Sequence, residues 1–199
     1  MFEIRYSELK QIMTKLFKYK WWGGTYDLNV VGIRCPNRTA DSFDDTIVAA
    51  YVDAHGNNRL TSFPITTDPG LNYLTKPINA KGCAILAPGQ YLGMWRLGKH
   101  QGKYPALVQV KPCKVFRDIN RDSKLDFEPH TLETGLFGIN LHYVTANTIV
   151  QSIGNGSAGC QVHPVKEDND YILSLVNLQM RYIKTDAVSY TLLLESELK

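Results

Sequence analysis

Short apolar runs separated by turn-forming residues follow one another along most of this chain. Many are rich in Val, Ile, Thr and Tyr, and such runs are typical of β-strands. We expect strands at 26–33, 46–52, 60–66, 83–86, 89–97, 106–116, 138–143, 148–153 and 189–194. The turn 53–58 makes the second and third of these a hairpin. Strands this short and this numerous predict a mainly β domain, either a β-sandwich or a barrel-like sheet.

Two segments carry the apolar spacing of helices instead. In residues 7–20, Leu9, Ile12, Met13 and Leu16 recur on one helical face, and Trp-Trp-Gly-Gly follows. We interpret residues 1–24 as a helical appendage and 25–199 as the main domain. A C-terminal helix is expected to begin near 165–168, just after Pro164.

Length, charge and cysteine content narrow the class of protein. The chain has 199 residues, which suits one domain, and its net charge of +3 is too small to indicate nucleic-acid binding. The four cysteines form no CxxC pair. The N-terminal residues lack the pattern of a secretory signal, and no run approaches the ~20 apolar residues of a membrane span. We therefore expect synthesis in the cytoplasm and no transmembrane segment.

The best-placed reactive residue is Cys160, in the run Gly154-Asn-Gly-Ser-Ala-Gly-Cys160. A loop of small residues lets backbone N–H groups approach an oxyanion, and a thiol becomes a good nucleophile beside a base. His142 lies on the polar side of an alternating strand and is the candidate base. Ser157 is a weaker candidate nucleophile, because a thiol is intrinsically more reactive. Motifs for nucleotide binding and for zinc peptidases are missing from the sequence.

Fourteen residues separate His142 from Ser157-Ala-Gly-Cys160. This arrangement resembles the L,D-transpeptidase catalytic domain (YkuD-type), in which a His is followed, after a similar interval, by Ser/Thr-His-Gly-Cys. The resemblance covers roughly residues 44–162. It includes the early hairpin with its Thr-containing turn, and Ala87-Pro-Gly-Gln-Tyr91, which is similar to the family's Thr-Pro-x-Gly-x-Phe/Tyr.

The resemblance implies a β-sandwich that forms a thioester with a peptidoglycan stem peptide, which an amine or water then releases. It makes Cys160 the nucleophile and His142 the general base. Backbone N–H groups of Gly159 and Cys160 would hold the oxyanion, and Ser157 would fix the tautomer of His142. No cofactor is implied.

The chain departs from the family pattern on both sides of the nucleophile. Ala158 replaces the His before Gly-Cys, and Val162 stands where Arg or Asn is usual. These changes put the standard substrate in question. The residues that we expect to bind substrate in their place are Gln161, Tyr143, Asn140 and Arg96. His100 could also approach the site, but we favour its interpretation as an ordinary loop histidine.

A second polar constellation has the spacing of a calcium loop. Oxygen-bearing side chains occupy positions 1, 3, 5 and 9 of an EF-hand-like segment, namely Asp118, Asn120, Asp122 and Asp126. Ser123 replaces the Gly of position 6, Pro129 replaces the Glu of position 12, and Arg121 and Lys124 add positive charge. The sequence therefore favours a polar turn over a calcium site.

The sequence is compatible with three functions. The leading hypothesis is a cysteine acyltransferase or peptidase acting on peptidoglycan stem peptides, with transpeptidation and hydrolysis both allowed. A signal-less chain of this kind suits a phage lysin or an enzyme carried on a phage particle, reaching the wall after lysis. The alternatives are a non-catalytic module that binds the cell wall or a protein, and a structural protein that docks through residues 7–20.

Overall fold

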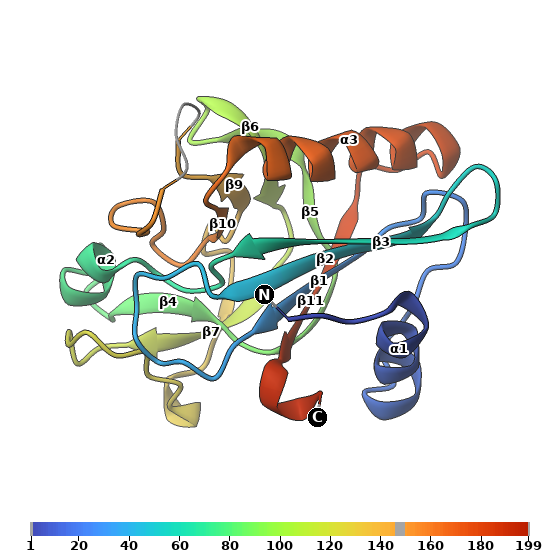
Figure 1. The fold of residues 1–199 in the computed structure, drawn as a ribbon. Helices are drawn as coiled ribbons and strands as arrows, with labels where there is room; N and C mark the ends of the chain where they lie inside the picture. The colour runs from blue at the N-terminus through green and yellow to red at the C-terminus, as the bar shows by residue number, and fades with distance from the viewer. Residues whose placement is uncertain (1, 146–149, 199) are drawn as a thin grey trace.

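The computed structural model describes residues 2–145 and 150–198. Its main sheet has eight strands in the order β10-β9-β6-β5-β11-β1-β2-β3 (Figure 1). They are β1 Asn29–Arg34, β2 Asp45–Val52, β3 Asn58–Ile65, β5 Gly89–His100, β6 Tyr104–Gln109, β9 Leu141–Tyr143, β10 Gln161–His163 and β11 Val188–Leu194. A bridge between Thr66 and Val162 joins the two outer strands at one end, so the sheet nearly closes on itself.

A small second sheet completes the β-structure. It pairs β4 Cys83–Leu86, β7 Cys113–Asp118 and β8 Glu133–Gly135. The helices are α1 Tyr6–Gln11, α2 Leu71–Thr75 and α3 Lys166–Tyr182, with a π-helical turn at Ile12–Leu16 and short 3-10 turns at Pro129–Thr131 and Glu195–Glu197. The prediction of a mainly β domain with an N-terminal and a C-terminal helix is confirmed.

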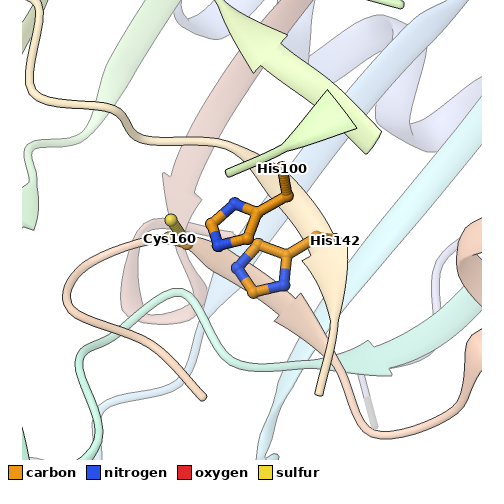
Figure 2. A group of neighbouring side chains, drawn as sticks. All are labelled: His100, His142 and Cys160. Atoms are coloured by element: carbon orange, nitrogen blue, oxygen red, sulfur yellow. The ribbon is translucent and has the colours of Figure 1, made fainter. Parts of the chain in front are cut away.

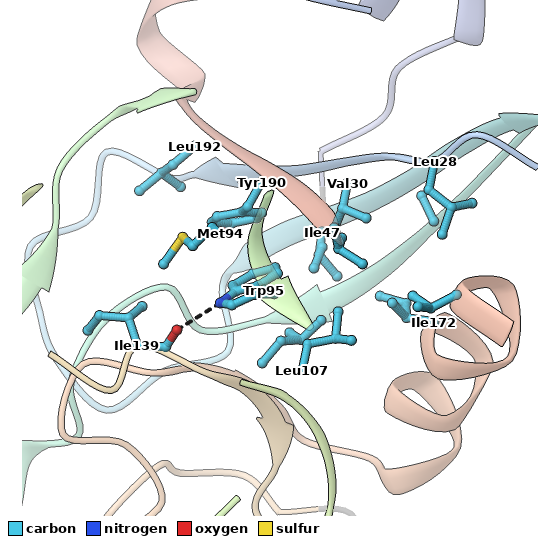
Figure 3. Packing of buried hydrophobic residues seen from close by; sticks show 14 of the residues in the cluster. Leu28, Val30, Ile47, Met94, Trp95, Leu107, Ile139, Ile172, Tyr190 and Leu192 are labelled. Atoms are coloured by element: carbon cyan, nitrogen blue, oxygen red, sulfur yellow. Dashed lines mark hydrogen bonds between the residues drawn. The ribbon is translucent and has the colours of Figure 1, made fainter. Parts of the chain in front are cut away.

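The main core lies between the sheet and α3, where Ile172 packs with buried residues of several strands (Figure 3). At its centre Trp95 stacks on Tyr190 with ring centroids 4.4 Å apart. Its indole Nε1 donates to the carbonyl of Ile139 at 2.7 Å. Because the indole N–H has a partner, this large ring is buried without an unpaired donor. The bond also ties the segment before β9 to the core.

The N-terminal helix covers the opposite face of the sheet from α3 (Figure 1). Leu9 and Met13 are fully buried against Val31, Val48 and Leu193. Strands β1 and β2 are therefore buried on both faces, which explains their continuous apolar sequences. The described part of the segment 1–24, which we expected to form an appendage, instead packs into the domain through this second core.

Several element boundaries differ from the sequence prediction. The predicted strand 106–116 is divided into β6 and β7, which belong to different sheets. The first helix ends at Leu16, and Lys18 follows with a left-handed φ of 57°. Part of the predicted strand 148–153 lies outside the described residues, and 150–153 are not in a strand. Strand β10 was not predicted. Within the described ranges, no helix combines the length and apolarity needed to cross a membrane.

Candidate active site

Two adjacent parallel strands bring His142 and Cys160 together. His142 is the middle residue of β9, and Cys160 comes directly before β10. The register pairs Val162 with His142, and the N–H of Gln161 donates to the carbonyl of Asn140 at 2.8 Å. Cys160 therefore lies beside Asn140, which is two residues before His142 and so points to the same face. The predicted proximity of the thiol and the imidazole is confirmed.

His142 lies beside the Cys160 thiol, which itself donates to the Gly138 carbonyl at 3.3 Å. Its Nδ1 lies 2.8 Å from the carbonyl oxygen of Tyr143, which can only accept, so Nδ1 carries the proton. The hydroxyl of Tyr104 lies 3.2 Å from the same nitrogen. Nε2 is buried and has no hydrogen-bond partner among the described residues. It is therefore an unpaired acceptor, and Figure 2 shows one nitrogen of the ring on the side of Cys160.

A second imidazole completes the cluster. The ring of His100 stacks on that of His142 with centroids 3.8 Å apart (Figure 2). His100 ends β5, and a tight turn with left-handed Gln101 and Gly102 leads to Tyr104 at the start of β6. Our interpretation of His100 as an ordinary loop histidine was wrong. Tyr104 was not predicted, because this hairpin comes to lie beside His142 only through the pairing of β6 with β5 and with β9.

The hydrogen bonds of Asn140 determine the tautomer of His100. The Asn140 side-chain oxygen accepts the backbone N–H of Gln109 at 2.8 Å, so its amide nitrogen faces His100 Nδ1 at 3.1 Å. That amide donates, and Nδ1 must accept. The proton of neutral His100 is therefore on Nε2. The two stacked rings thus offer opposite groups, an acceptor on His142 and an N–H donor on His100.

Burial keeps the thiol and both imidazoles uncharged. It raises the pKa of the Cys160 thiol to about 11. It lowers the pKa of His142 to about 4, and the neighbouring His100 acts in the same direction. Burial, helped by Lys103, also lowers the pKa of His100. At neutral pH the resting site is a thiol beside neutral imidazoles, not a thiolate–imidazolium pair.

The loop before Cys160 is held by its own hydrogen bonds. Ser157 Oγ donates to the Cys160 carbonyl at 2.9 Å and accepts the Gly159 N–H at 3.1 Å. Gly159 has a φ of +121°, and a Cβ there would lie 2.1 Å from the Ala84 carbonyl oxygen of β4. The loop therefore needs glycine to pack against β4.

These bonds correct two predicted roles. Ser157 does not fix the tautomer of His142, because its hydroxyl is used within the loop and its carbonyl accepts Gly70 N–H. The Tyr143 carbonyl fixes that tautomer instead. The Gly159 N–H is committed to Ser157 and does not face an oxyanion. Of the predicted pair of oxyanion donors, only the backbone N–H of Cys160 remains.

Of the expected substrate-binding residues, only Asn140 lines the pocket over the thiol. Gln161 is fully buried, accepting the Tyr190 hydroxyl at 2.7 Å and donating to the Thr67 carbonyl at 3.3 Å. Tyr143 is buried and contributes its carbonyl to His142. Arg96 is exposed and lies 3.7 Å from Asp186. For Gln161 and Tyr143, strand alternation directs the side chain away from the pocket, whereas Arg96 lies farther along β5 from His100 and outside the pocket lining.

The pocket over the thiol has a volume of about 440 Å³. Its walls come from the β5–β6 hairpin, the strand β9, the loop 154–160 that ends at Cys160 (the nucleophile loop), and α2 with the segment that follows it. Residues from these four parts include His100, Tyr104, His142, Gly156, Ala158 and Tyr73. Cys160 lies at the wall formed by the nucleophile loop. Ala158, the departure noted in the sequence, also faces the pocket and leaves space beside the thiol.

His100, His142 and Cys160 are residue types that bind zinc in many proteins. One donor atom each of His100, His142 and Cys160 lie within 4.8 Å of one another. Zinc would need a lone pair on each of these atoms. The Asn140 amide places the proton of His100 on the nitrogen that would have to bind the metal. The arrangement therefore fits a hydrogen-bonding cluster better than a metal centre.

Comparison with known proteins gives no match to a family model, a curated protein or a solved structure. The resemblance to L,D-transpeptidases therefore rests on the His142 and Ser157–Cys160 residues and the order of the upstream segments.

Proposed function

We propose that the chain is a cysteine acyltransferase or peptidase that acts through a thioester on Cys160. The observation that carries the proposal is the buried, unpaired Nε2 of His142 beside the thiol, with Nδ1 held by a backbone carbonyl. A buried acceptor without a hydrogen-bond partner costs free energy, and a catalytic role is one explanation for such a group. Accepting the proton of Cys160 is a role that this geometry supports once the thiol, which donates to the Gly138 carbonyl at 3.3 Å, turns toward His142.

The reaction has two stages. His142 Nε2 takes the thiol proton as the sulfur attacks a carbonyl carbon, giving a tetrahedral oxyanion. When this intermediate collapses, the C–N bond breaks and the leaving amine takes the proton from His142. A second amine, or water, then attacks the thioester and gives its proton to His142. The C–S bond breaks, and the thiolate recovers a proton from His142.

The oxyanion needs donors, and the site offers two. They are the backbone N–H of Cys160 and the Nε2–H of His100, whose direction Asn140 sets. We propose that His100 donates to the oxyanion in place of the Gly159 N–H, which is bonded to Ser157. Losing one such donor costs roughly 10²–10³ in kcat. His100→Ala is expected to lower kcat by about that factor with little change in KM.

We propose peptidoglycan stem peptides as the substrate, on the strength of the motif resemblance. The pocket lining is mainly neutral, with imidazole, phenol and amide groups that can bond a peptide backbone. Whether the acceptor is water or an amine sets the outcome as hydrolysis or cross-linking. Action at the cell wall after lysis, by a phage-borne enzyme, stays part of this proposal.

The test is to incubate the protein with purified stem peptides, with and without an added amine, and to search for an acyl adduct on Cys160 by intact-mass spectrometry. Cys160→Ala should abolish both adduct and product. Cys113→Ala is the matched control, because that buried thiol lies outside the pocket. Absence of turnover and adduct in the wild type would refute the proposed function.

A second candidate is a non-catalytic module on the same fold. It is favoured by the uncharged resting site, in which the pKa of Cys160 is raised to about 11 by burial. A binding module would hold stem peptides with an affinity that Cys160→Ala leaves unchanged. Measurement of peptide binding by wild type and Cys160→Ala, beside the adduct assay, separates the two functions.

A further inference from the structure

A second pocket, which we call the side pocket, adjoins the pocket over the Cys160 thiol. It has a volume of about 300 Å³. Ile78 and Ala158 line both pockets, so the two share a boundary. The other walls of the side pocket come from the segment 79–84, from Arg117 of β7, and from Leu136 and Phe137.

The same stretches of chain run along both pockets. The segment 73–84 lines the pocket over the thiol at its start and the side pocket at its end. The segment 136–142 runs the other way, since Leu136 lines the side pocket and Gly138 lines the pocket over the thiol. The Gly138 carbonyl accepts the catalytic thiol at 3.3 Å. The two pockets therefore form one groove, and the thiol lies close to the place where they meet.

The side pocket carries the two most exposed large apolar side chains of the described chain. Ile78 is 79% exposed and Leu136 is 65% exposed. A single exposed apolar side chain is common on a protein surface, but apolar side chains that gather around a hollow mark a binding site. The small side chains of Cys83 and Ala84 are buried behind them in β4. The surface of the side pocket is therefore mainly apolar.

The charge in this wall is already used. Among the described residues that line the side pocket, Arg117 alone is charged. It pairs with Glu133 at 3.0 Å and donates to the Gly82 carbonyl at 3.3 Å. Its guanidinium carbon lies 4.9 Å from the centre of the Phe137 ring. Because these contacts hold Arg117 within the wall, the pocket suits an uncharged apolar side chain better than an anionic one.

We propose that the side pocket binds a large apolar side chain of the peptide substrate, carried by the residue next to the carbonyl that Cys160 attacks. This inference rests on the proposed acyl transfer and adds a requirement on the substrate. Neighbouring residues of an extended peptide are about 3.5 Å apart, so a carbonyl over the thiol brings the adjoining side chain to the shared boundary. Ala158 keeps that boundary open, because a larger side chain would occupy space that both pockets share.

The test measures the binding of fluorescein-labelled stem-peptide analogues to the full chain carrying Cys160→Ala, in which turnover is prevented. Each position of the analogue carries Ala, Leu or Asp in turn. At one position, Leu should bind about 10–100-fold more tightly than Ala or Asp in fluorescence anisotropy, because its side chain leaves water.

Ile78→Ser and Leu136→Ser should each reduce this preference at least about threefold, and the double variant should abolish it. Both side chains are exposed, so these changes should leave folding intact. Leu16→Ser is the matched control, because Leu16 is 61% exposed and lines neither pocket. It should keep the full preference for Leu.

The inference is overturned if no analogue binds, if Leu is never favoured over Ala, or if the preference survives in the double variant. A preference for Asp would also contradict it, by showing that Arg117 makes the pocket cationic. The same analogues are incubated with the wild-type chain to detect an acyl adduct on Cys160. Adducts without a preference for Leu would remove the side pocket alone, whereas a preference for Leu without adducts would remove the proposed chemistry alone.

Discussion

At the scale of single residues, the environment of each titratable group decides what it can do. Cys160 and His142 are both buried, and both are neutral at rest because low polarity disfavours their charged forms. Catalysis by such a pair needs the proton to move as the substrate carbonyl is attacked. We therefore expect the Cys160 thiol to react slowly with general thiol reagents and faster with a substrate that fills the pocket.

Alkylation of Cys160 by iodoacetamide should consequently increase with pH well beyond the range of an ordinary thiol. With a pKa of about 11, the thiolate fraction rises about tenfold per pH unit from pH 7 to pH 10. Site-resolved mass spectrometry over this range measures the rate. A short cysteine peptide is the control and should level off near its ordinary pKa of about 8.5. A plateau for Cys160 near pH 7 would show a preformed thiolate and contradict the neutral resting site.

His163 is fully buried, and burial lowers its pKa to about 3 against the opposite, smaller effect of the Pro64 backbone. The unfolded chain therefore binds a proton that the folded chain excludes below about pH 6.5, and stability falls as the pH decreases. His163→Phe should remove this term. Relative to wild type, the variant should gain about 2–3 kcal/mol in free energy of unfolding between pH 7.5 and pH 4.5. Urea unfolding at both pH values measures the change, and parallel losses in both proteins would refute it.

At the scale of elements, the N-terminal helix acts as the cover of one sheet face. Leu9→Ala should lower the free energy of unfolding by about 2–5 kcal/mol, because Leu9 is fully buried between the helix and the strands β1 and β2. Leu16→Ala is the matched control. Leu16 is 61% exposed, and its replacement should cost less than about 0.5 kcal/mol. Equal effects of the two changes would show that residues 1–24 are an appendage after all.

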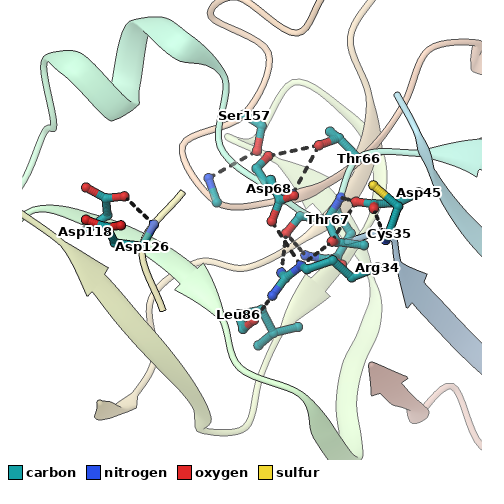
Figure 4. A network of polar contacts seen from close by, with 12 residues as sticks. Arg34, Cys35, Asp45, Thr66, Thr67, Asp68, Leu86, Asp118, Asp126 and Ser157 are labelled. Carbon is teal, nitrogen blue, oxygen red and sulfur yellow. Dashed lines mark hydrogen bonds and ion pairs between the residues drawn. The ribbon is translucent and has the colours of Figure 1, made fainter. Parts of the chain in front are cut away.

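At the scale of the whole molecule, one buried ionic network joins the main sheet to the second sheet. Arg34 of β1 donates to the Leu86 carbonyl of β4 at 2.9 Å, and to Thr67 (Figure 4). It also pairs with Asp68 at 3.0 Å, while Asp45 accepts the N–H and the hydroxyl of Thr67 at 2.7 Å. This network orients the segment that leads from β3 toward the nucleophile loop.

Arg34→Met should be strongly destabilising, by about 3–5 kcal/mol, because Asp45 and Asp68 would remain buried without their cation. Arg34 lowers the pKa of both carboxyl groups against the larger, opposite effect of burial. Without it both pKa values rise further, the folded variant takes up protons, and its deficit should shrink as the pH falls from 8 to 5. Chemical unfolding at the two pH values measures this. Arg59→Met, which removes a largely exposed guanidinium from its pair with Asp53, should have a much smaller effect.

Local patterns in the sequence predicted what depends on local spacing. The strands β2, β3 and β4 and the helix α3 follow from apolar periodicity, and the meeting of His142 with Cys160 follows from a motif whose two halves lie on neighbouring strands. The calcium-loop spacing was also visible, but its departures at Ser123 and Pro129 weighed against it.

Long-range pairing settled the rest. His100 and Tyr104 join the site because β6 pairs with both β5 and β9. The structural role of Gln161 depends on its bonds to Thr67 and Tyr190, and the need for glycine at 159 depends on β4. Residues far apart in sequence meet only after the sheet order is established. Apolar periodicity says which face of a strand is buried, but strand order depends on the free energy of the assembled core, to which every strand contributes.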